Sequence, residues 1–166
     1  KLRDLLKAKK WKEADEETRV KILKVANRES EGWLRFEDAK NFSCQDLGTI
    51  DKLWVKYSNG KFGFSVQKQI YQSLGGTKEF NWDDYKKLAD KVGWRKGGEW
   101  LDYSELELTF SEKHYRGHLP QRAPTYTLAP GHLPIPLYQY FEYWDGVEEK
   151  KGKRRPFLSH VETCRL

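Results

Sequence analysis

The distribution of proline constrains the fold of this chain more than any other sequence feature. Residues 117–136 hold five of the six prolines and carry the tetrapeptide GHLP twice, at 117–120 and 131–134. Proline at this density excludes a long helix, because each ring removes a backbone donor and clashes with the preceding turn. The sequence therefore predicts a core over residues 1–120 and, over 121–166, a Pro-rich and basic irregular extension that packs on the core or trails from it.

Apolar residues recur at helical spacing before the prolines. Residues 1–27 have the pattern of an amphipathic helical hairpin with a break near residues 7–11. Ser43 is followed three residues later by Asp46, an arrangement related to the capping box that starts many helices. A helix is therefore expected from about residue 44 to a turn near residue 60.

Two further helices are expected after that turn. Ser65 is a candidate cap for the first of them, which stops at the glycine pair 75–76, and Asn81 is expected to start the second. The predicted fold class is all-α, a compact helical bundle followed by the Pro-rich irregular extension.

The stretch VKYSNGKFGFSVQ, residues 55–67, contains an Asn-Gly pair, which is the strongest short-range signal for a β-hairpin. Strands this short would have no third partner to make a sheet, so the turn is expected to join two helices instead. Phe62 and Phe64 then lie between helix ends, where they either line a cleft or fill the core, and the residues alone leave both readings open.

A second Gly-rich loop, VGWRKGGEWLDY at residues 92–103, again combines large rings with basic side chains. Two such loops are suited to form the walls of a cleft for a flat, apolar ligand with acidic groups, since rings cover its faces while cations meet its carboxylates. The rings and cations of this loop are Trp94, Trp100, Tyr103, Arg95 and Lys96.

The overall charge favours an anionic partner without identifying it. The formal net charge is +6 and the pI is about 9.2, which is compatible with nucleic acid, an acidic membrane surface or a ligand that carries carboxylates. No stretch is long and apolar enough to span a bilayer, and no signal or transit peptide is recognisable. The absence of Met suggests a trimmed or processed product.

The cysteines and histidines give no sign of a metal centre or an enzyme. Cys44 and Cys164 lie far apart without ligand spacing, so neither a zinc site nor a disulfide framework is expected, and a reducing compartment is favoured. All four histidines fall in the late region, away from a nucleophile. His118 and His132, in the two GHLP repeats, are better explained by hydrogen bonds to backbone near a turn than by ligation of a metal.

Several long runs carry a family resemblance. They are DLGTIDKLWVKYSNGKFGFSVQKQIY, GWLRFEDA, VGWRKGGEWLDYSEL and RGHLP. Together they cover about residues 1–120 in family order, and they closely resemble the genomes-uncoupled tetrapyrrole-binding regulators of magnesium chelatase, of a plastid and more specifically algal type. This resemblance implies an all-helical core shaped like a cupped hand, whose concave face holds protoporphyrin IX or Mg-protoporphyrin IX.

The resemblance also implies a set of site residues and a cellular role. Val55, Asn59 and Phe64 would line the palm, aromatic residues of the second loop would sit on or beside a mobile lid, and Arg116 would face a propionate. The expected porphyrin-binding residues are Val55, Asn59, Phe62, Phe64, Trp94, Trp100, Tyr103 and Arg116. No catalytic residue, metal site or catalytic cofactor is expected.

The family's role is regulatory rather than enzymatic. Its members stimulate magnesium chelatase through the large porphyrin-binding subunit in chlorophyll biosynthesis, and they are linked to plastid signalling and peripheral membrane association. A monomer in the chloroplast stroma and at its membranes is therefore expected, with the cyanobacterial cytoplasm as the alternative. Two rival readings remain: a helical-repeat-like protein-interaction module without a tetrapyrrole, and a nucleic-acid binder, which would lose affinity steeply with added salt.

Overall fold

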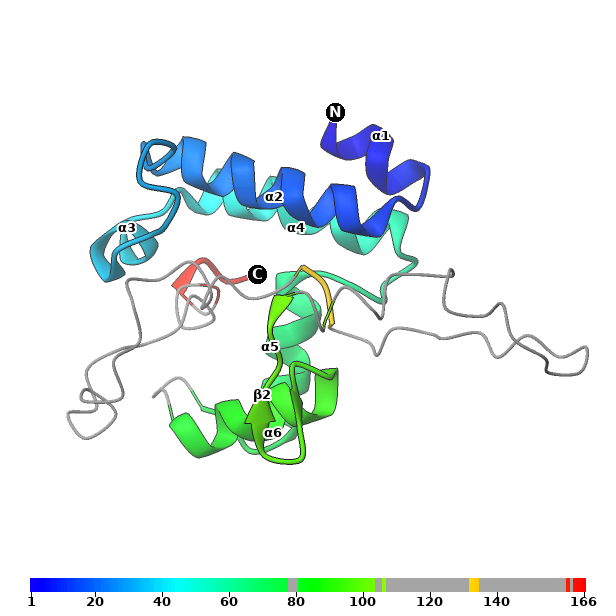
Figure 1. The fold of residues 1–166 in the computed structure, drawn as a ribbon, viewed down its shortest axis with the longest axis vertical. Helices are drawn as coiled ribbons and strands as arrows, with labels where there is room; N and C mark the ends of the chain where they lie inside the picture. Colours follow the sequence, from blue (N-terminus) through cyan, green and yellow to red (C-terminus); the bar gives the residue numbers. More distant parts are fainter. Residues whose placement is uncertain (78–80, 104–105, 107–131, 135–160, 162) are drawn as a thin grey trace, which may run out of the picture.

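The structure is a computed structural model, and it describes residues 1–77, 81–103, 106, 132–134, 161 and 163–166. Six helices and one pair of very short strands make up this part of the chain (Figure 1). In chain order they are α1 (Leu2–Lys7), α2 (Trp11–Val25), α3 (Phe36–Lys40), α4 (Cys44–Tyr57), α5 (Phe64–Ser73), α6 (Trp82–Val92), β1 (Arg95–Lys96) and β2 (Glu99–Trp100). The predicted all-α class is confirmed, and the strand pair is a small addition to it.

Polar caps start two of the helices where the sequence predicted them. The Ser43 hydroxyl accepts a hydrogen bond of 3.2 Å from the backbone N–H of Asp46 at the start of α4, and the Asn81 side chain accepts two backbone N–H groups at the start of α6. Such caps satisfy donors that have no partner within the helix.

The predicted cap of α5 is wrong. This helix begins at Phe64, directly after Gly63, and Ser65 lies inside it. The backbone N–H of Ser65 instead donates to a carboxylate oxygen of Asp51 on α4, at 2.9 Å. A charged carboxylate is a stronger acceptor than a hydroxyl, so the neighbouring helix provides the cap that the local sequence was expected to provide.

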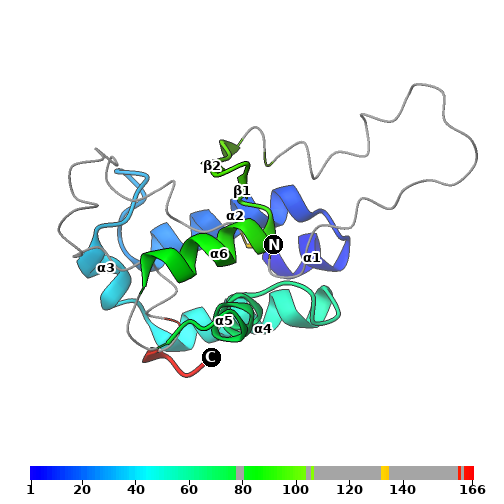
Figure 2. The ribbon, with the colours of Figure 1, turned by 90° about the horizontal axis from the view of Figure 1, so that it is seen from below.

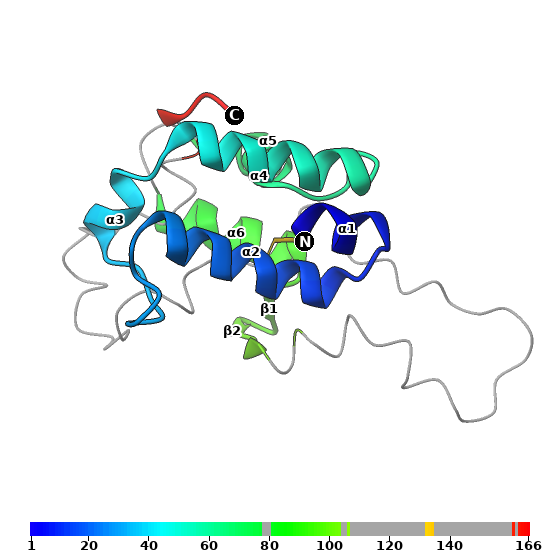
Figure 3. The ribbon, with the colours of Figure 1, turned by 90° about the horizontal axis from the view of Figure 1, so that it is seen from above.

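Helices α2 and α4 lie side by side, with α1 packed on both (Figures 1 and 3). The joint between them is polar at one buried point, where the Trp54 indole Nε1–H donates to the Thr18 hydroxyl at 2.9 Å. That hydroxyl in turn donates to the Ala14 carbonyl oxygen at 2.8 Å. Helix α5 runs crosswise to α4, and it leads to α6 on the other side of the molecule (Figure 1).

The turn between α4 and α5 connects two helices, as predicted. Asn59 and Gly60 both adopt positive φ, 55° and 77°, and the Gly60 N–H donates to the Val55 carbonyl oxygen at 2.8 Å, which ends the helix. The Ser58 hydroxyl accepts the N–H of Phe62 at 2.8 Å. These bonds use the backbone donors that a β-hairpin would have needed.

The second Gly-rich stretch was predicted to be a loop, and it is a β-hairpin. Arg95 pairs with Trp100 and Lys96 with Glu99 in an antiparallel register. The two glycines between the strands have φ of 62° and 91°, and two-residue hairpins of this kind need positive φ. Figure 2 shows the hairpin beyond the end of α6. The Gly-Gly pair was therefore a hairpin signal, not only a sign of flexibility.

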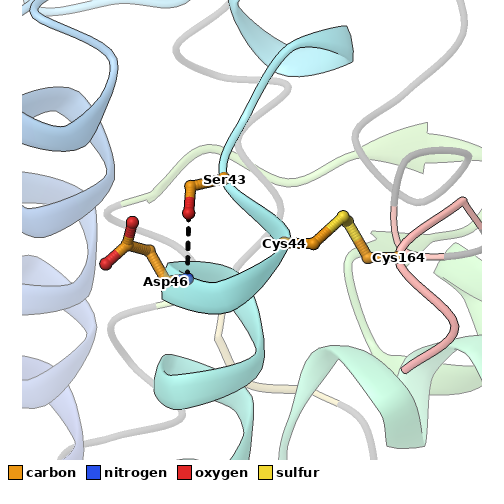
Figure 4. Close-up of a disulfide and its surroundings, with 4 residues drawn as sticks. All are labelled: Ser43, Cys44, Asp46 and Cys164. Carbon is orange, nitrogen blue, oxygen red and sulfur yellow. Dashed lines mark hydrogen bonds between the residues drawn. A yellow bond between two sulfur atoms is a disulfide. The ribbon is translucent and has the colours of Figure 1, made fainter.

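The two cysteines form a disulfide, which corrects the prediction that they would not. The Cys44 and Cys164 sulfur atoms are bonded, and their Cα atoms are 5.1 Å apart although 120 residues separate them (Figure 4). Spacing rules detect metal ligands that are close in sequence, and they carry no information on a pair that the fold brings together. The preference for a reducing compartment rested on this reading and loses its support.

Parts of the predicted extension lie in the core. His132, Leu133 and Val161 are buried, with at most 2% of their surface exposed. The boundary at residue 120 and the cupped shape of the core both stay predictions, and residues 121–131 and 135–160 lie outside the described part. In the described residues, no helix has the length and apolarity needed to cross a membrane.

Candidate functional site

Three aromatic rings meet where α2, α4 and the α4–α5 turn converge. We call Trp11, Trp54 and Phe62 the α2–α4 ring cluster. The Trp11 ring stacks on Trp54 with centroids 6.2 Å apart and meets Phe62 edge-on at 5.3 Å. Trp54 and Phe62 are buried, whereas Trp11 is half-buried. The cluster is therefore a packed aromatic core with one indole at its surface.

A second group of rings gathers between the first turn of α6 and the strand pair that follows this helix. We call Trp82, Tyr85, Trp94 and Trp100 the hairpin ring cluster. Trp82 lies 5.5 Å from Tyr85 and 5.9 Å from Trp100, and Tyr85 lies 6.3 Å from Trp94, between ring centroids. Tyr85 and Trp94 are buried, while Trp82 and Trp100 are half-buried. This cluster thus presents two partly exposed indoles.

The segment 132–134 joins the two loops that carry these rings. The Trp94 indole N–H donates to the carbonyl oxygen of His132 at 2.9 Å, and the backbone N–H of Gly63 donates to that of Leu133 at 2.9 Å. The Gln67 side chain on α5 donates to the Pro134 carbonyl oxygen at 2.7 Å. Residues 132–134 are therefore hydrogen-bonded to residues from both predicted cleft walls.

Gly63 has no freedom to carry a side chain at this junction. Its φ is 142°, and a Cβ built on it would lie 2.8 Å from both the Asp51 carboxylate and the Val55 side chain. In the structure the neighbours that come close are Asp51 and Val55 of α4, so the glycine serves the helix junction.

His132 is held by backbone, as predicted for the GHLP repeat. Its Nδ1 lies 2.6 Å from the Val92 carbonyl oxygen, and its side chain is 2% exposed. Burial lowers the pKa of His132 below its usual value, the hydrogen bond with Val92 acts in the opposite direction, and the nearby Lys61 charge lowers it further. The same residue of the other repeat, His118, lies outside the described residues.

Tyr103 ties the segment after the strand pair to α2. Its hydroxyl donates to the Asp15 carboxylate at 3.2 Å, and Asp15 is buried. Because α2 also carries Trp11, this bond brings the two ring clusters onto a common framework. Segment 132–134 and the Tyr103–Asp15 bond thus connect the two aromatic loops through shared neighbours.

Two cations accompany the rings. The Lys61 Nζ lies 5.3 Å from the centroid of Phe62, and burial lowers the pKa of Lys61. The Arg95 guanidinium lies 5.4 Å from the Trp100 centroid and pairs with Asp90 at 3.1 Å. Its Nε–H is buried without an acceptor among the described residues. An ammonium and a guanidinium are both suited to a carboxylate, and in this conformation the Arg95 Nε–H is shielded from solvent.

The structure sorts the predicted site residues by their exposure. Val55, Trp100 and Tyr103 are half-buried and Asn59 is exposed, so a ligand can reach them. Phe62, Phe64 and Trp94 are at most 3% exposed, so they are core residues in this conformation. Arg116 lies outside the described residues. Direct contact of all eight with a porphyrin stays a prediction.

Three residues of this region were not among the predicted site residues. Trp11 and Trp82 lie where helical periodicity predicts an apolar face, and no role was predicted for Lys61. Helical periodicity cannot separate a ring that is fully packed from one that is half-exposed at a helix end. A lysine inside an Asn-Gly-Lys-Phe turn was the one available signal, since it places a charge next to an aromatic ring.

The side chains of this region are rings and cations rather than a set of metal ligands. Within the described residues, no group of three or more His, Cys, Asp or Glu side chains is arranged to hold an ion. Half-exposed indoles beside cations instead favour a flat apolar molecule with acidic substituents.

Comparison with known proteins is consistent with this reading. Residues 1–129 match the model of a protein family described as GUN4-like. The chain is 41% identical over 120 residues to the uncharacterized protein ycf53 of Pyropia yezoensis, a match that covers 71% of this chain and 45% of that protein. It is 31% identical over 120 residues to the chloroplastic tetrapyrrole-binding protein of Arabidopsis thaliana, covering 66% and 43% of the two.

The chain spans less than half the length of these two relatives. A solved structure, the ligand-free structure of Arabidopsis thaliana GUN4, resembles the fold with a TM-score of 0.56 and 23% identity. The alignment covers 96% of this chain and 87% of that one. At this identity the likeness extends to the fold alone.

Proposed function

This chain belongs to the GUN4-like family, and from that premise we propose that it binds the tetrapyrroles protoporphyrin IX and Mg-protoporphyrin IX without catalysing a reaction. The observation that carries the proposal is the pairing of half-exposed indoles with cations, Trp100 with Arg95 and Trp82 with Lys86, in a chain of this family. The relative from Arabidopsis thaliana, which is named as a tetrapyrrole-binding protein, supports it.

The chemical groups of a tetrapyrrole match the rings and cations of this region. A tetrapyrrole has a large flat apolar face, so ring contact and burial dominate its affinity, at about 25 cal/mol per Å² of apolar surface removed from water. Its propionates need cations at the rim. Lys61 and Arg95 would supply them from the described residues, and Arg116 would supply another.

Direct contact is proposed for the reachable residues, which are Val55, Asn59, Trp100 and Tyr103. The buried residues Phe62, Phe64 and Trp94 would support these from beneath and reach a ligand only after a local rearrangement. A site of this kind, built on turns and a short hairpin, can accept and release its ligand more readily than a closed cavity.

The proposed role is regulatory. Bound porphyrin would be presented to the large porphyrin-binding subunit of magnesium chelatase, which would stimulate chlorophyll biosynthesis and link the protein to plastid signalling. We place it as a monomer in the chloroplast, in the stroma and peripherally at membranes, with the cyanobacterial cytoplasm as the alternative. The higher identity to the algal relative than to the Arabidopsis one favours an algal source.

Quenching of tryptophan fluorescence by added protoporphyrin IX tests this function on the full chain. Trp100→Ala should weaken binding several-fold, because about 1 kcal/mol or more of ring contact is lost. Trp33→Ala is the matched control, since Trp33 stacks under Arg28 and belongs to neither ring cluster. Its affinity should equal that of the wild type.

A second pair of variants tests the carboxylate contact. Lys61→Gln should weaken binding of protoporphyrin IX several-fold, while Lys56→Gln, which removes an exposed lysine near Tyr57, should not. Equal affinity of Lys61→Gln and wild type would remove Lys61 from the site. Absence of any quenching of the wild type would favour the protein-interaction module instead.

A further inference from the structure

Three independent contacts hold the C-terminal segment, residues 161 and 163–166, against α4 and α5. The Cys44–Cys164 disulfide ties it to the first residue of α4 (Figure 4). The Lys68 ammonium on α5 donates to the Leu166 carbonyl oxygen at 2.8 Å. The Leu166 side chain lies over Gly48, where an added Cβ would be 3.4 Å from its Cδ2. This short segment thus bridges two helices.

The disulfide is accessible. Cys44 is an exposed residue and Cys164 is half-buried, so a protein nucleophile can approach the sulfur atoms from solvent. Structural disulfides that persist under reducing conditions are typically shielded, whereas exposed ones are the more readily exchanged. Figure 4 shows the bridge at the exposed start of α4, next to the Ser43 cap.

We propose that the Cys44–Cys164 disulfide is a site of thiol–disulfide exchange with a dithiol protein, and that its reduction releases residues 161 and 163–166 from α4 and α5. The proposal is independent of tetrapyrrole binding, because none of the residues in it belongs to the proposed site. It assigns a covalent modification to the two cysteines and a redox protein as a partner.

The exchange balances as two successive displacements. A thiolate of the dithiol protein attacks Cys164 Sγ, a mixed disulfide forms, and Cys44 leaves as a thiolate. The second thiol of the partner, after losing its proton, attacks its own sulfur in the mixed disulfide and expels the Cys164 thiolate. The partner is oxidised to a disulfide, two electrons pass to this chain, and both cysteines end as thiols after taking up two protons.

The position of Cys44 favours this direction of attack. It is the first residue of a 14-residue helix, where the backbone N–H groups and the helix dipole stabilise a negative charge. A stabilised thiolate is the better leaving group in thiol–disulfide exchange. Cys44 is therefore the sulfur expelled first, and Cys164 is the one that forms the mixed disulfide.

Noncovalent contacts remain after reduction, and among the described residues they include the Lys68 hydrogen bond and the packing of Leu166 and Val161. These contacts would have to hold the segment without the covalent closure of a 120-residue stretch. Loss of that closure raises the entropy of the released chain. The segment should then exchange between bound and free positions.

Cysteine alkylation and hydrogen exchange on the full chain test both parts of the proposal. The oxidised protein, denatured with iodoacetamide, should add no label, and after incubation with thioredoxin, thioredoxin reductase and NADPH it should add two. Amide exchange over residues 161–166 should become about tenfold faster on reduction. Labelling of both cysteines before reduction, resistance of the bond to thioredoxin, or unchanged exchange would each overturn it.

Two variants separate release from general unfolding. Cys44→Ser, which cannot form the bridge, should show without any reductant the fast exchange of residues 161–166 that the reduced wild type shows, and thioredoxin should then have no further effect. Lys68→Gln with the disulfide intact should keep slow exchange, because the covalent bond still holds the segment. Fast exchange in oxidised Lys68→Gln, or slow exchange in Cys44→Ser, would contradict the proposal that the disulfide holds the C-terminal segment in place.

Discussion

At the scale of single residues, Gly63 is a position at which the junction between α4 and α5 requires a glycine. It has a φ of 142°, donates its N–H to Leu133, and leaves no room for a Cβ beside Asp51 and Val55. Gly63→Ala should therefore destabilise the fold by about 1–3 kcal/mol, through backbone strain and a clash. Chemical denaturation monitored by circular dichroism measures this.

Gly60 is the matched control for Gly63. It also has positive φ, 77°, but nothing lies within 4 Å of an added Cβ. Gly60→Ala should cost only about 1 kcal/mol, from the backbone alone. Equal losses of stability in the two variants would mean that the close approach of Asp51 and Val55 has no energetic weight.

The lowered pKa of buried His132 leads to a prediction of how stability depends on pH. Burial lowers its pKa in the folded state, while the unfolded chain binds the proton near pH 6.5. The free energy of unfolding is therefore highest above pH 6.5 and falls as the pH drops from there toward the folded pKa. The slope from this group is at most about 1.4 kcal/mol per pH unit.

Urea denaturation from pH 7.5 to 5 tests this, with His132→Gln as the comparison. The variant is expected to be less stable at every pH but to lack the slope that His132 contributes. Carboxyl groups such as Asp38, whose pKa the hydrogen bond from Arg35 lowers, act in a more acidic range. An equal slope in wild type and variant between pH 6.5 and 5 would contradict the account.

At the scale of helices, α2 and α4 depend on one buried polar link. The Trp54 indole N–H donates to the Thr18 hydroxyl, and both residues are at most 2% exposed. Thr18→Val keeps the shape but leaves the indole donor without its acceptor, which should lower the free energy of unfolding by about 1–3 kcal/mol. Thermal or urea denaturation measures the difference.

Thr49→Val is the control for this link. Thr49 also donates its hydroxyl to a carbonyl within its helix, that of Gln45, but the bond is exposed. Water can replace it, so stability should change by less than about 0.5 kcal/mol. A loss as large as that of Thr18→Val would show that helix propensity, and not the buried link, sets the effect.

The helix starts that depend on nearby residues were predictable from the sequence. The one that depends on a tertiary contact was not. Ser43 and Asn81 cap helices from within a few residues, so their sequence context was sufficient. The cap at Ser65 failed because Asp51, fourteen residues away, provides a better acceptor. The strand pair was missed because the Gly-Gly pair was interpreted as a flexible loop. It is instead a two-residue turn in which both glycines have positive φ.

At the scale of the whole molecule, the disulfide closes most of the chain into one loop. It joins residues 120 apart, and the chain-entropy relation gives a stabilisation of about 5 kcal/mol for a loop of that length. Cys164→Ser should therefore lower the free energy of unfolding, with that figure as the upper bound. Denaturation of wild type with and without a reducing agent measures it independently.

The variant and the reduced wild type are controls for each other. They should unfold at the same denaturant concentration, and a reducing agent should leave Cys164→Ser unchanged. If the oxidised wild type and the variant unfold together, the bridge does not stabilise the fold.

The candidate site was predictable only in part at this scale. Sequence identified the two aromatic loops through their composition and through family motifs, and the structure brings them together. The sequence could not indicate that residues 132–134 contact both loops. Hydrogen bonds such as that from Trp94 to His132 join residues 38 apart, and only the fold brings them together. For the same reason, half-exposed Trp11 and buried Phe64 looked alike in sequence.

The central claim is that half-exposed rings beside cations bind a tetrapyrrole, and a Soret titration tests it most directly. Protoporphyrin IX added to the oxidised full chain should show a shifted Soret band that saturates at one ligand per chain. The midpoint should change little between low and high salt, because apolar burial and not charge dominates affinity. An unshifted, non-saturating band, the same as in buffer without protein, would contradict the account.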